Sequence, residues 1–168
     1  DTAIPIGHGE EMMTPTLEGR VLQALNPGSG DKILEVGTGT GFLAACFARL
    51  AASVTSIDIH EDLLERARVN LEDTGIDDVS LLNMDATQEL PDEKFDIVAV
   101  SGSVREFDPR FVEVLAPGGR LFVVVGKAPA MDARLVTKID DKEWESESLF
   151  ETTLKPLTDA RQQPEFLF

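Results

Sequence analysis

The sequence has 168 residues, 42% of them hydrophobic, and its 15 basic and 31 acidic side chains give a formal net charge of −16. This length supports one buried core and is short for two, so we expect a single domain over residues 1–168. An acidic chain without a basic patch repels a phosphate backbone, and no apolar run approaches the roughly 20 residues that span a bilayer. We therefore expect no nucleic-acid partner and no membrane segment, and the oligomeric state stays open.

The single cysteine, Cys46, cannot form a disulfide within the chain. It lies in the apolar run 42–52, which predicts a small core residue rather than a reactive thiol. A reducing compartment, the cytoplasm, is the expected location.

The first predicted helix starts at Pro15, because a hydroxyl at Thr14 followed by proline is typical of a helix N-terminus. The run 26–30 of Asn, Pro, Gly and Ser ends this helix. Its apolar face is formed by Leu17, Val21, Leu22 and Leu25.

Beyond this helix, short apolar strands alternate with amphipathic helices. The strands are predicted at 33–36, 54–58, 79–82, 95–100 and 120–125, and the helices at 42–52, 61–74 and 107–115. This alternation indicates an α/β fold with a mostly parallel sheet covered by helices on both faces. Two last strands, 133–139 and 149–154, are joined by the polar stretch 140–147, which predicts an antiparallel pair at the sheet edge. The tail 161–168 is not assigned.

A glycine-rich loop joins the first strand to the following helix. Gly37, Gly39 and Gly41 stand where the chain must turn sharply and where a ligand can approach the backbone without a Cβ atom in the way. This context predicts a nucleotide or nucleoside site. The dinucleotide fingerprint GxGxxG/A would need a small residue where this chain has Phe42, so the pattern favours a nucleoside cofactor without pyrophosphate.

Acidic and small residues follow the next strands at the same sheet edge. Asp58 ends the second strand, where an acid can accept hydrogen bonds from both ribose hydroxyls, although it could instead cap the helix at 61–74. Asp85 follows the third strand and could meet an adenine amino group, with Ala86 leaving room for the ring. The alternative for Asp85 is a surface turn. Ser101 follows the fourth strand, at the edge where open α/β sheets bind ligands, and 101–103 should face the substrate.

These residues resemble the class I S-adenosylmethionine-dependent methyltransferases and, more narrowly, the protein-L-isoaspartate O-methyltransferase family. The segment Ile4-Pro5-Ile6-Gly7-His8-Gly9 is similar to the L-P-I-G-x-G segment of that family, and 33–42 is similar to its L-E-I-G-T-G-S-G-Y loop. The resemblance implies a Rossmann-like domain with a seven-stranded sheet, preceded in the family by a helical segment. It also implies S-adenosylmethionine as cofactor, S-adenosylhomocysteine as product and isoaspartyl residues of damaged proteins as acceptors. The expected cofactor residues are Glu35, Gly37, Thr38, Gly39, Gly41, Asp58, Ile59, Asp85, Ala86 and Ser101, and no metal is expected.

The chain departs from the family where the acceptor should bind. The serine of the family's T-I-S-x-P motif aligns with Met13, and Thr14 is the nearest hydroxyl that could replace it as an active-site residue. An isoaspartyl carboxylate is ionised at neutral pH, so the reaction needs no general base. His60 is expected in a solvated loop, and His8 is a minor candidate for touching substrate.

Three functions remain open on the sequence. The first is methylation of isoaspartyl carboxylates. The second is methylation of a small-molecule metabolite by a diverged enzyme, which the changed acceptor residues would suit. The third is cofactor binding with little catalysis, which the loss of the serine hydroxyl would suit.

Overall fold

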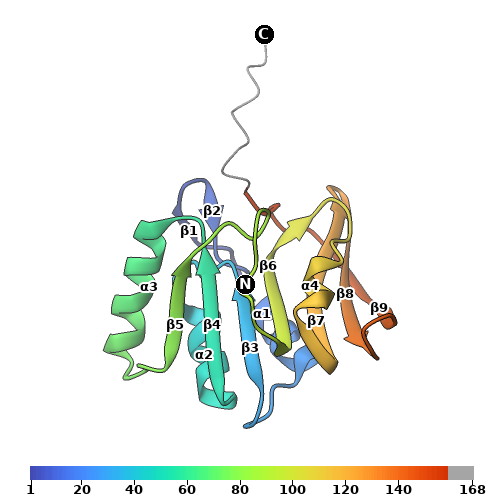
Figure 1. The fold of residues 1–168 in the computed structure, drawn as a ribbon. Coiled ribbons are helices and arrows are strands. Elements are labelled where there is room, and N and C mark those ends of the chain that lie inside the picture. The colour runs from blue at the N-terminus through green and yellow to red at the C-terminus, as the bar shows by residue number, and fades with distance from the viewer. Residues whose placement is uncertain (159–168) are drawn as a thin grey trace.

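The computed structural model describes residues 1–158, and a seven-stranded sheet forms its centre (Figure 1). In spatial order, the strands are β5 (Val79–Asn83), β4 (Ser53–Asp58), β3 (Lys32–Val36), β6 (Phe95–Val104), β7 (Leu115–Lys127), β8 (Ala130–Lys138) and β9 (Trp144–Thr152). The helices are α1 (Pro15–Leu25), α2 (Phe42–Leu50), α3 (Glu61–Asp73) and α4 (Arg110–Glu113). A separate short hairpin is made by β1 (Pro5–Gly7) and β2 (Glu10–Glu11).

The strand order of the sheet reverses at β3, which is the first strand of this sheet in the sequence. β3 pairs in parallel with β4 on one side and with β6 on the other, and β6 pairs in parallel with β7. The strands β8 and β9 extend the sheet beyond β7 through antiparallel pairs. In open α/β sheets, ligands bind outside the carboxyl ends of the strands at such a switch point. The loops that follow β3 and β6 are therefore the expected place for a site.

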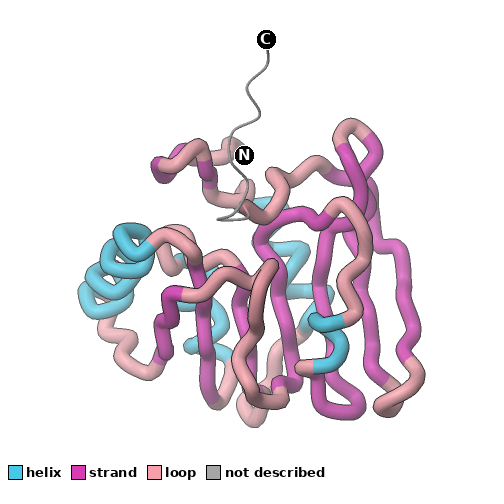
Figure 2. The backbone as a smooth tube through the Cα atoms, turned by 45° about the horizontal axis from the view of Figure 1, so that its top comes forward, coloured by secondary structure: helices cyan, strands magenta, loops and turns pink. Residues whose placement is uncertain are grey.

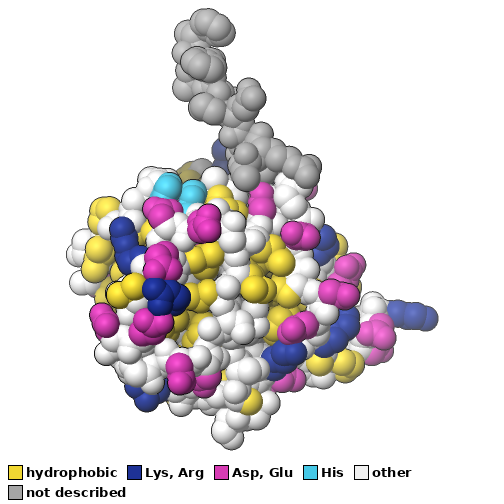
Figure 3. Space-filling view, turned by 60° about the vertical axis from the view of Figure 1, so that its left-hand side comes forward, with side chains coloured by type: hydrophobic (Ala, Val, Ile, Leu, Met, Phe, Trp, Pro, Cys, Tyr) yellow, Lys and Arg dark blue, Asp and Glu magenta, His cyan; other side chains and the backbone are white. Residues whose placement is uncertain are grey.

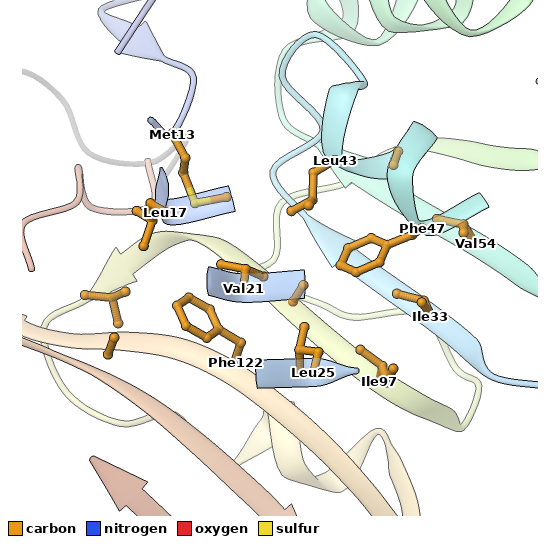
Figure 4. Close-up of a cluster of buried hydrophobic side chains, with 14 of the residues drawn as sticks. Met13, Leu17, Val21, Leu25, Ile33, Leu43, Phe47, Val54, Ile97 and Phe122 are labelled. Carbon is orange, nitrogen blue, oxygen red and sulfur yellow. The ribbon is translucent and has the colours of Figure 1, made fainter. Parts of the chain in front are cut away.

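Helices α1 and α2 cover one face of the sheet, and α4 lies on the other face (Figure 1). Figure 4 shows the first core, in which α1 and α2 side chains meet side chains that project from the strands. Its fully buried centre includes Leu25, Ile33, Phe47, Ile97 and Phe122. The α4 side chains Phe111 and Val112 belong to the second core on the opposite face.

Helix α1 begins as its sequence predicts. The Thr14 hydroxyl accepts a hydrogen bond from the Leu17 amide at 3.3 Å, which satisfies one of the amides that the first turn leaves without a partner. Pro15 occupies the first helical position, where its missing N–H costs nothing. At the other end, Asn26 adopts a left-handed conformation with φ 43° and terminates the helix.

The predicted fold class is confirmed, including the mostly parallel sheet and the antiparallel pair at its edge. Most predicted strands and helices have the observed position within a few residues. The unassigned tail 161–168 lies outside the described residues.

The predicted lengths of one helix and one strand were wrong. The helix predicted at 107–115 is reduced to α4, because the Phe95 amide bonds to the Val114 carbonyl and Leu115 already pairs with Phe95 in the sheet. Strand β9 begins at Trp144, so half of the polar stretch predicted as a connection is strand. β9 pairs with β8 alone, and an edge strand exposed to solvent carries charged residues without loss.

Cys46 is only half-buried on the side of α2, so it is more exposed than the predicted core position implies. The buried side chains of this helix are Leu43, Ala44 and Phe47, and Cys46 lies at the edge of the helix face that they form. Within residues 1–158, none of the helices has the length and apolar character that crossing a bilayer requires.

Candidate functional site

A cavity of about 320 Å³ lies at the carboxyl ends of the parallel strands. This is within the range of about 300–1,000 Å³ that small-molecule sites occupy. Its walls come from the loops after β3, β4 and β5, from the hairpin β1–β2 and from the segment 152–158. Ser101 and Gly102 also line it, and they lie within β6, because this strand continues beyond the predicted range 95–100. Figure 2 shows the hairpin above the carboxyl ends of the strands.

The glycine loop forms the wall nearest β3. Gly37 and Gly39 line the cavity with φ of +96° and +53°, which side chains other than glycine rarely adopt. A Cβ atom at Gly37 would lie 3.2 Å from the Ser101 Cβ atom, so the loop passes β6 too closely for a side chain. Gly41 lies further along, where a Cβ atom would approach Ala67 of α3 at 3.1 Å. The loop therefore presents bare backbone to the cavity and packs its last glycine against a helix.

Asp58 places its carboxylate in the cavity wall at the end of β4 and is 9% exposed. Its Oδ1 accepts a hydrogen bond from the His60 amide at 2.9 Å, and its Oδ2 accepts one from the Gly39 amide at 3.0 Å. A carboxylate has about four acceptor positions, so these bonds fix its orientation and leave capacity for ligand hydroxyls. The alternative role as a helix cap is not observed, because His60 is the N-cap residue of α3.

The predicted adenine side of the cavity is made by residues after β4 and β5. Ile59, Asp85 and Ala86 all line it, and Ala86 is buried. The Asp85 Oδ1 atom accepts hydrogen bonds from the Thr87 amide at 2.9 Å and the Thr87 hydroxyl at 2.6 Å, so Asp85 also shapes its turn. Both expectations for Asp85, turn residue and cavity residue, are compatible with this geometry.

Three of the predicted cofactor residues, Ser101, Glu35 and Thr38, lie near the glycine loop, but not all of them line the main cavity. Ser101 lines the main cavity, and its Oγ atom is buried without a hydrogen-bond partner in residues 1–158. Glu35 and Thr38 lie behind the loop and line a second, smaller cavity instead of the main one. The Glu35 Oε1 atom accepts a hydrogen bond from Ser56 at 2.5 Å, and the Ser56 and Thr38 hydroxyls are 2.7 Å apart. Glu35 and Thr38 therefore form a hydrogen-bonded group with Ser56 behind the glycine loop, on the side away from the main cavity.

Thr14 and Met13 line the main cavity from the start of α1. The Thr14 hydroxyl oxygen accepts the helix-capping bond, and a hydroxyl that accepts can still donate its hydrogen to another group. Met13 is 8% exposed and packs in the first core, where Figure 4 shows it above Leu17. The position that aligns with the family serine is thus filled by an apolar side chain, with a hydroxyl beside it.

The sequence did not predict the roof of the cavity, which consists of the hairpin β1–β2 and the segment 152–158. Lys155 Nζ donates to the Gly9 carbonyl, and the Thr158 hydroxyl donates to Glu10 at 2.7 Å, so the two parts of the roof are joined. The Ser103 amide bonds to the Lys155 carbonyl at 2.8 Å, which fixes the segment to β6. Lys155 is the one lysine or arginine among the residues of the described chain that line this cavity.

The two histidines meet at the rim of the cavity. Their rings stack with centroids 3.9 Å apart and an interplanar angle of 12°, and His8 hydrogen-bonds Asp62 at 2.8 Å. This bond holds the pKa of the Asp62 carboxyl below its ordinary value. His60 lies in the loop before α3 as predicted, but it is only partly exposed and lines the cavity with a buried Nε2 atom. Ligand atoms of the three side chains lie within 4.8 Å of one another, but nearly parallel rings do not aim their nitrogen lone pairs at one point.

The cavity fits S-adenosylmethionine in several respects. Asp58 offers acceptors for ribose hydroxyls, Ala86 and Ile59 offer apolar contact for a base, and Gly37 allows close approach of the ligand to the backbone. The buried Ser101 hydroxyl still needs a partner, which a polar ligand could supply.

Known proteins share sequence similarity with most of this chain. The model of the family described as protein-L-isoaspartate(D-aspartate) O-methyltransferase matches residues 1–162. The protein-L-isoaspartate O-methyltransferase of Koribacter versatilis is 37% identical over 152 residues, which cover 84% of this chain and 68% of the relative. Protein-L-isoaspartate O-methyltransferase 1 of Anaeromyxobacter sp. strain Fw109-5 is 38% identical over 163 residues, which cover 95% of this chain and 77% of the relative.

Solved structures agree on the fold. A beta-aspartate methyltransferase from Plasmodium falciparum, solved in complex with S-adenosyl-L-homocysteine, superposes with a TM-score of 0.80 and covers 94% of this chain and 80% of its own. At 21% identity, this likeness supports the fold alone. The family match and the two curated relatives carry the assignment. This chain belongs to the protein-L-isoaspartate(D-aspartate) O-methyltransferase family of S-adenosylmethionine-dependent methyltransferases.

Proposed function

We propose that the main cavity binds S-adenosylmethionine and an isoaspartyl residue of a damaged protein, and that the chain methylates the isoaspartyl carboxylate. The observation that carries this proposal is that one cavity brings together residues suited to both partners. The open glycine loop and Asp58 suit the nucleoside. The Thr14 hydroxyl at the start of α1 and the Lys155 ammonium of the roof suit an anionic acceptor.

The residues of this chain act by binding and orientation. S-adenosylmethionine, when bound, supplies a methyl group on a positively charged sulfur. Asp58, held by two backbone amides, is rigid enough to fix the ribose. Methyl transfer between two aligned groups gains its rate mainly from positioning and from exclusion of water, and the roof provides the exclusion. Because an isoaspartyl carboxylate is ionised at neutral pH, no side chain has to remove a proton.

Thr14 and Lys155 are the proposed acceptor residues. The Thr14 hydroxyl can donate to one carboxylate oxygen while it caps α1. Lys155 uses one hydrogen for the Gly9 carbonyl, and an ammonium group has three. The remaining hydrogens can bind the carboxylate or the peptide that carries it. Lys155 also offsets the acidic side chains of the rim, such as Glu10 and Glu11, which would otherwise repel an anionic acceptor.

One observation favours a second candidate, methylation of a small metabolite. Met13 fills the position that aligns with the family serine, so this wall is more apolar than the family motif implies. A small acceptor with an apolar part would contact Met13 without needing a serine hydroxyl.

Nucleic acid and membrane partners have no place in this proposal. The net charge is −16, and on the face shown in Figure 3 the basic side chains are interspersed with acidic ones. The unpaired Cys46 supports a reducing compartment such as the cytoplasm.

The test uses two peptides that differ in one linkage. The protein is incubated with S-adenosylmethionine labelled in the methyl group and with a peptide that contains either isoaspartate or normal aspartate. Methyl esters are measured as volatile methanol released by alkali. We expect label on the isoaspartyl peptide alone. No label on either peptide, together with label on a metabolite extract, would replace the proposal by the second candidate.

A pair of variants tests the acceptor wall. Lys155→Gln should raise KM for the isoaspartyl peptide about tenfold with a smaller effect on KM for the cofactor, because a charge-assisted hydrogen bond is lost. Lys127→Gln changes an exposed lysine at the end of β7 and is the matched control. Equal KM values for the two variants would show that Lys155 does not bind the acceptor.

A further inference from the structure

Arg110, the first residue of α4, contacts the turn that follows β5. Its Nη2 atom donates a hydrogen bond to the Ala86 carbonyl at 2.9 Å. Ala86 lines the main cavity on the side proposed for the nucleobase, and it belongs to the same buried cluster as Phe111 of α4. Arg110 is not among the described residues that line the cavity. A charged side chain outside the cavity is therefore bonded to the backbone of its wall.

The Arg110 guanidinium is held in one orientation by Asp108. The Nε atom donates to both oxygens of the Asp108 carboxylate at 3.1 Å, and Nη2 donates to Oδ2 at 2.6 Å. Burial acts to raise the pKa of Asp108, but the hydrogen bonds and the charge of Arg110 outweigh it and hold that pKa below its ordinary value. Because the guanidinium is already fixed by this carboxylate, it loses little side-chain freedom when it also bonds to the Ala86 carbonyl.

The peptide group between Ala86 and Thr87 links Arg110 to Asp85. The carbonyl and the N–H of a trans peptide group point in opposite directions. Here the carbonyl accepts the Arg110 bond, and the Thr87 N–H donates to the Asp85 Oδ1 atom at 2.9 Å. A cation on the carbonyl polarises the peptide group and strengthens the hydrogen bond that its N–H donates. Arg110 therefore helps to fix the Asp85 carboxylate, although the two side chains lie on opposite sides of this peptide group.

The two side chains also interact through space. The bond to Asp108 is the main cause that raises the pKa of Arg110, and the negative charge of Asp85 contributes to the same shift. Asp85 lines the cavity, where a carboxylate accepts hydrogen bonds and donates none. A carboxylate in a fixed position selects ligands that carry a donor opposite it.

We propose that Arg110 is a positioning residue that makes the site select an adenine nucleoside over a purine nucleoside without the exocyclic amino group. It does so by holding the Asp85 carboxylate in place through the Ala86–Thr87 peptide group. The inference rests on the proposed function, because it requires the adenosine of the cofactor in this cavity with its amino group at Asp85. A site built to bond a donor binds the ligand that lacks it more weakly, because a polar group is then left unpaired.

The test is calorimetric titration with S-adenosylhomocysteine and with its analogue in which unsubstituted purine replaces adenine. The two ligands differ only in the exocyclic amino group. For the unaltered protein we expect S-adenosylhomocysteine to bind about tenfold more tightly than the analogue, as one charge-assisted hydrogen bond implies. Arg110→Met should reduce this preference to about twofold, because S-adenosylhomocysteine binds about fivefold more weakly while the analogue is little affected. Arg110→Lys keeps a charged donor and should retain a preference of about fivefold.

Arg134→Met is the matched control. Arg134 also forms an ion pair with an aspartate two residues earlier, Asp132, and its side chain is 36% exposed, compared with 35% for Arg110. It lies on β8, and it is not among the described residues that line the cavity. Arg134→Met should bind both ligands as the unaltered protein does.

A double variant tests whether Arg110 acts through Asp85. In a protein that already carries Asp85→Asn, adding Arg110→Met should change S-adenosylhomocysteine affinity by less than about twofold, because the carboxylate that Arg110 positions is gone. The same fivefold loss in both backgrounds would show that the two residues act independently, and it would overturn the inference.

The outcomes separate the inference from the proposed function. Arg110 does not set the selectivity if the unaltered protein binds both ligands equally, or if Arg110→Met weakens both to the same degree or neither; the proposed function then stands. If neither ligand binds the unaltered protein, both are overturned. If Arg110→Met does not fold, as circular dichroism would show, Asp108→Asn decides, because it frees the guanidinium without removing it. A preference lowered about threefold would support the inference, and an unchanged preference would overturn it.

Discussion

The buried carboxyl group of Glu18 should make the stability of this protein depend on pH in a predictable way. Burial raises its pKa from 4.5 to about 7 in the folded chain. In the unfolded chain the Glu18 carboxyl group ionises near its ordinary pKa of 4.5. Between about pH 4.5 and about pH 7, the folded state therefore binds one more proton than the unfolded state does. Stability is therefore lost progressively as pH rises from about 4.5 to about 7, and it is not regained above that. Glu18→Gln removes this loss.

The pKa difference sets the magnitude. At about 1.36 kcal/mol per pH unit, a rise from 4.5 to about 7 corresponds to about 3 kcal/mol. Urea unfolding at about pH 5 and about pH 8, followed by circular dichroism, measures the effect. Part of this loss has already occurred at pH 5, so the gain in free energy of unfolding from Glu18→Gln should be about 2.5 kcal/mol larger at the higher pH. The exposed variant Glu147→Gln should show no such difference. An equal effect of Glu18→Gln at both pH values would refute the buried, protonated state of this group.

Three further predictions concern the cavity walls. Thr14→Ala should lower the free energy of unfolding by about 1 kcal/mol through loss of the helix cap, and should also raise KM for the peptide, whereas a change in stability alone would remove Thr14 from the acceptor site. Gly37→Ala should weaken S-adenosylhomocysteine binding in calorimetry at least tenfold, because a Cβ atom would lie 3.2 Å from Ser101 at a φ of +96°; unchanged affinity would mean that the ligand does not approach the loop. Met13→Ser should cost about 2 kcal/mol of stability by urea unfolding, since a buried methionine leaves the core, yet should raise kcat/KM for the isoaspartyl peptide; a lower kcat/KM would count against an intact acceptor site.

The sequence predicted the cofactor wall because that wall is built from local patterns. A strand, a glycine loop and a helix follow one another within 33–52, and Asp58 ends the adjacent strand. In a parallel sheet, the carboxyl ends of neighbouring strands meet at one edge, so short-range patterns are enough to bring these residues together.

The roof could not be predicted in this way, because it depends on contacts between distant parts of the chain. The segment 152–158 lies against β6 because Gly102 has no side chain, and a Cβ atom there would lie 2.6 Å from Leu157. β1 and β2 are too short to give a periodic signal. Lys155 was therefore not recognised as part of the cavity.

The small cavity behind the glycine loop was missed for a different reason. Glu18 stands beside Leu17 on α1, and its neighbours predict only that one helix face is apolar. In the structure Glu18 shares this cavity with Glu35 and the glycine loop, and the helix pattern alone does not define that position. A single charged residue next to an apolar stripe was the available signal, and it is a weak one, because most such residues reach solvent.

The central claim is that one cavity holds both the cofactor and the isoaspartyl acceptor. A crystal structure of the protein with S-adenosylhomocysteine and an isoaspartyl peptide tests it most directly. We expect the ribose hydroxyls to bond to Asp58 and the isoaspartyl carboxylate to lie between Thr14 and Lys155, facing the sulfur. An acceptor bound outside this cavity, or a nucleoside that does not contact Asp58, would contradict it.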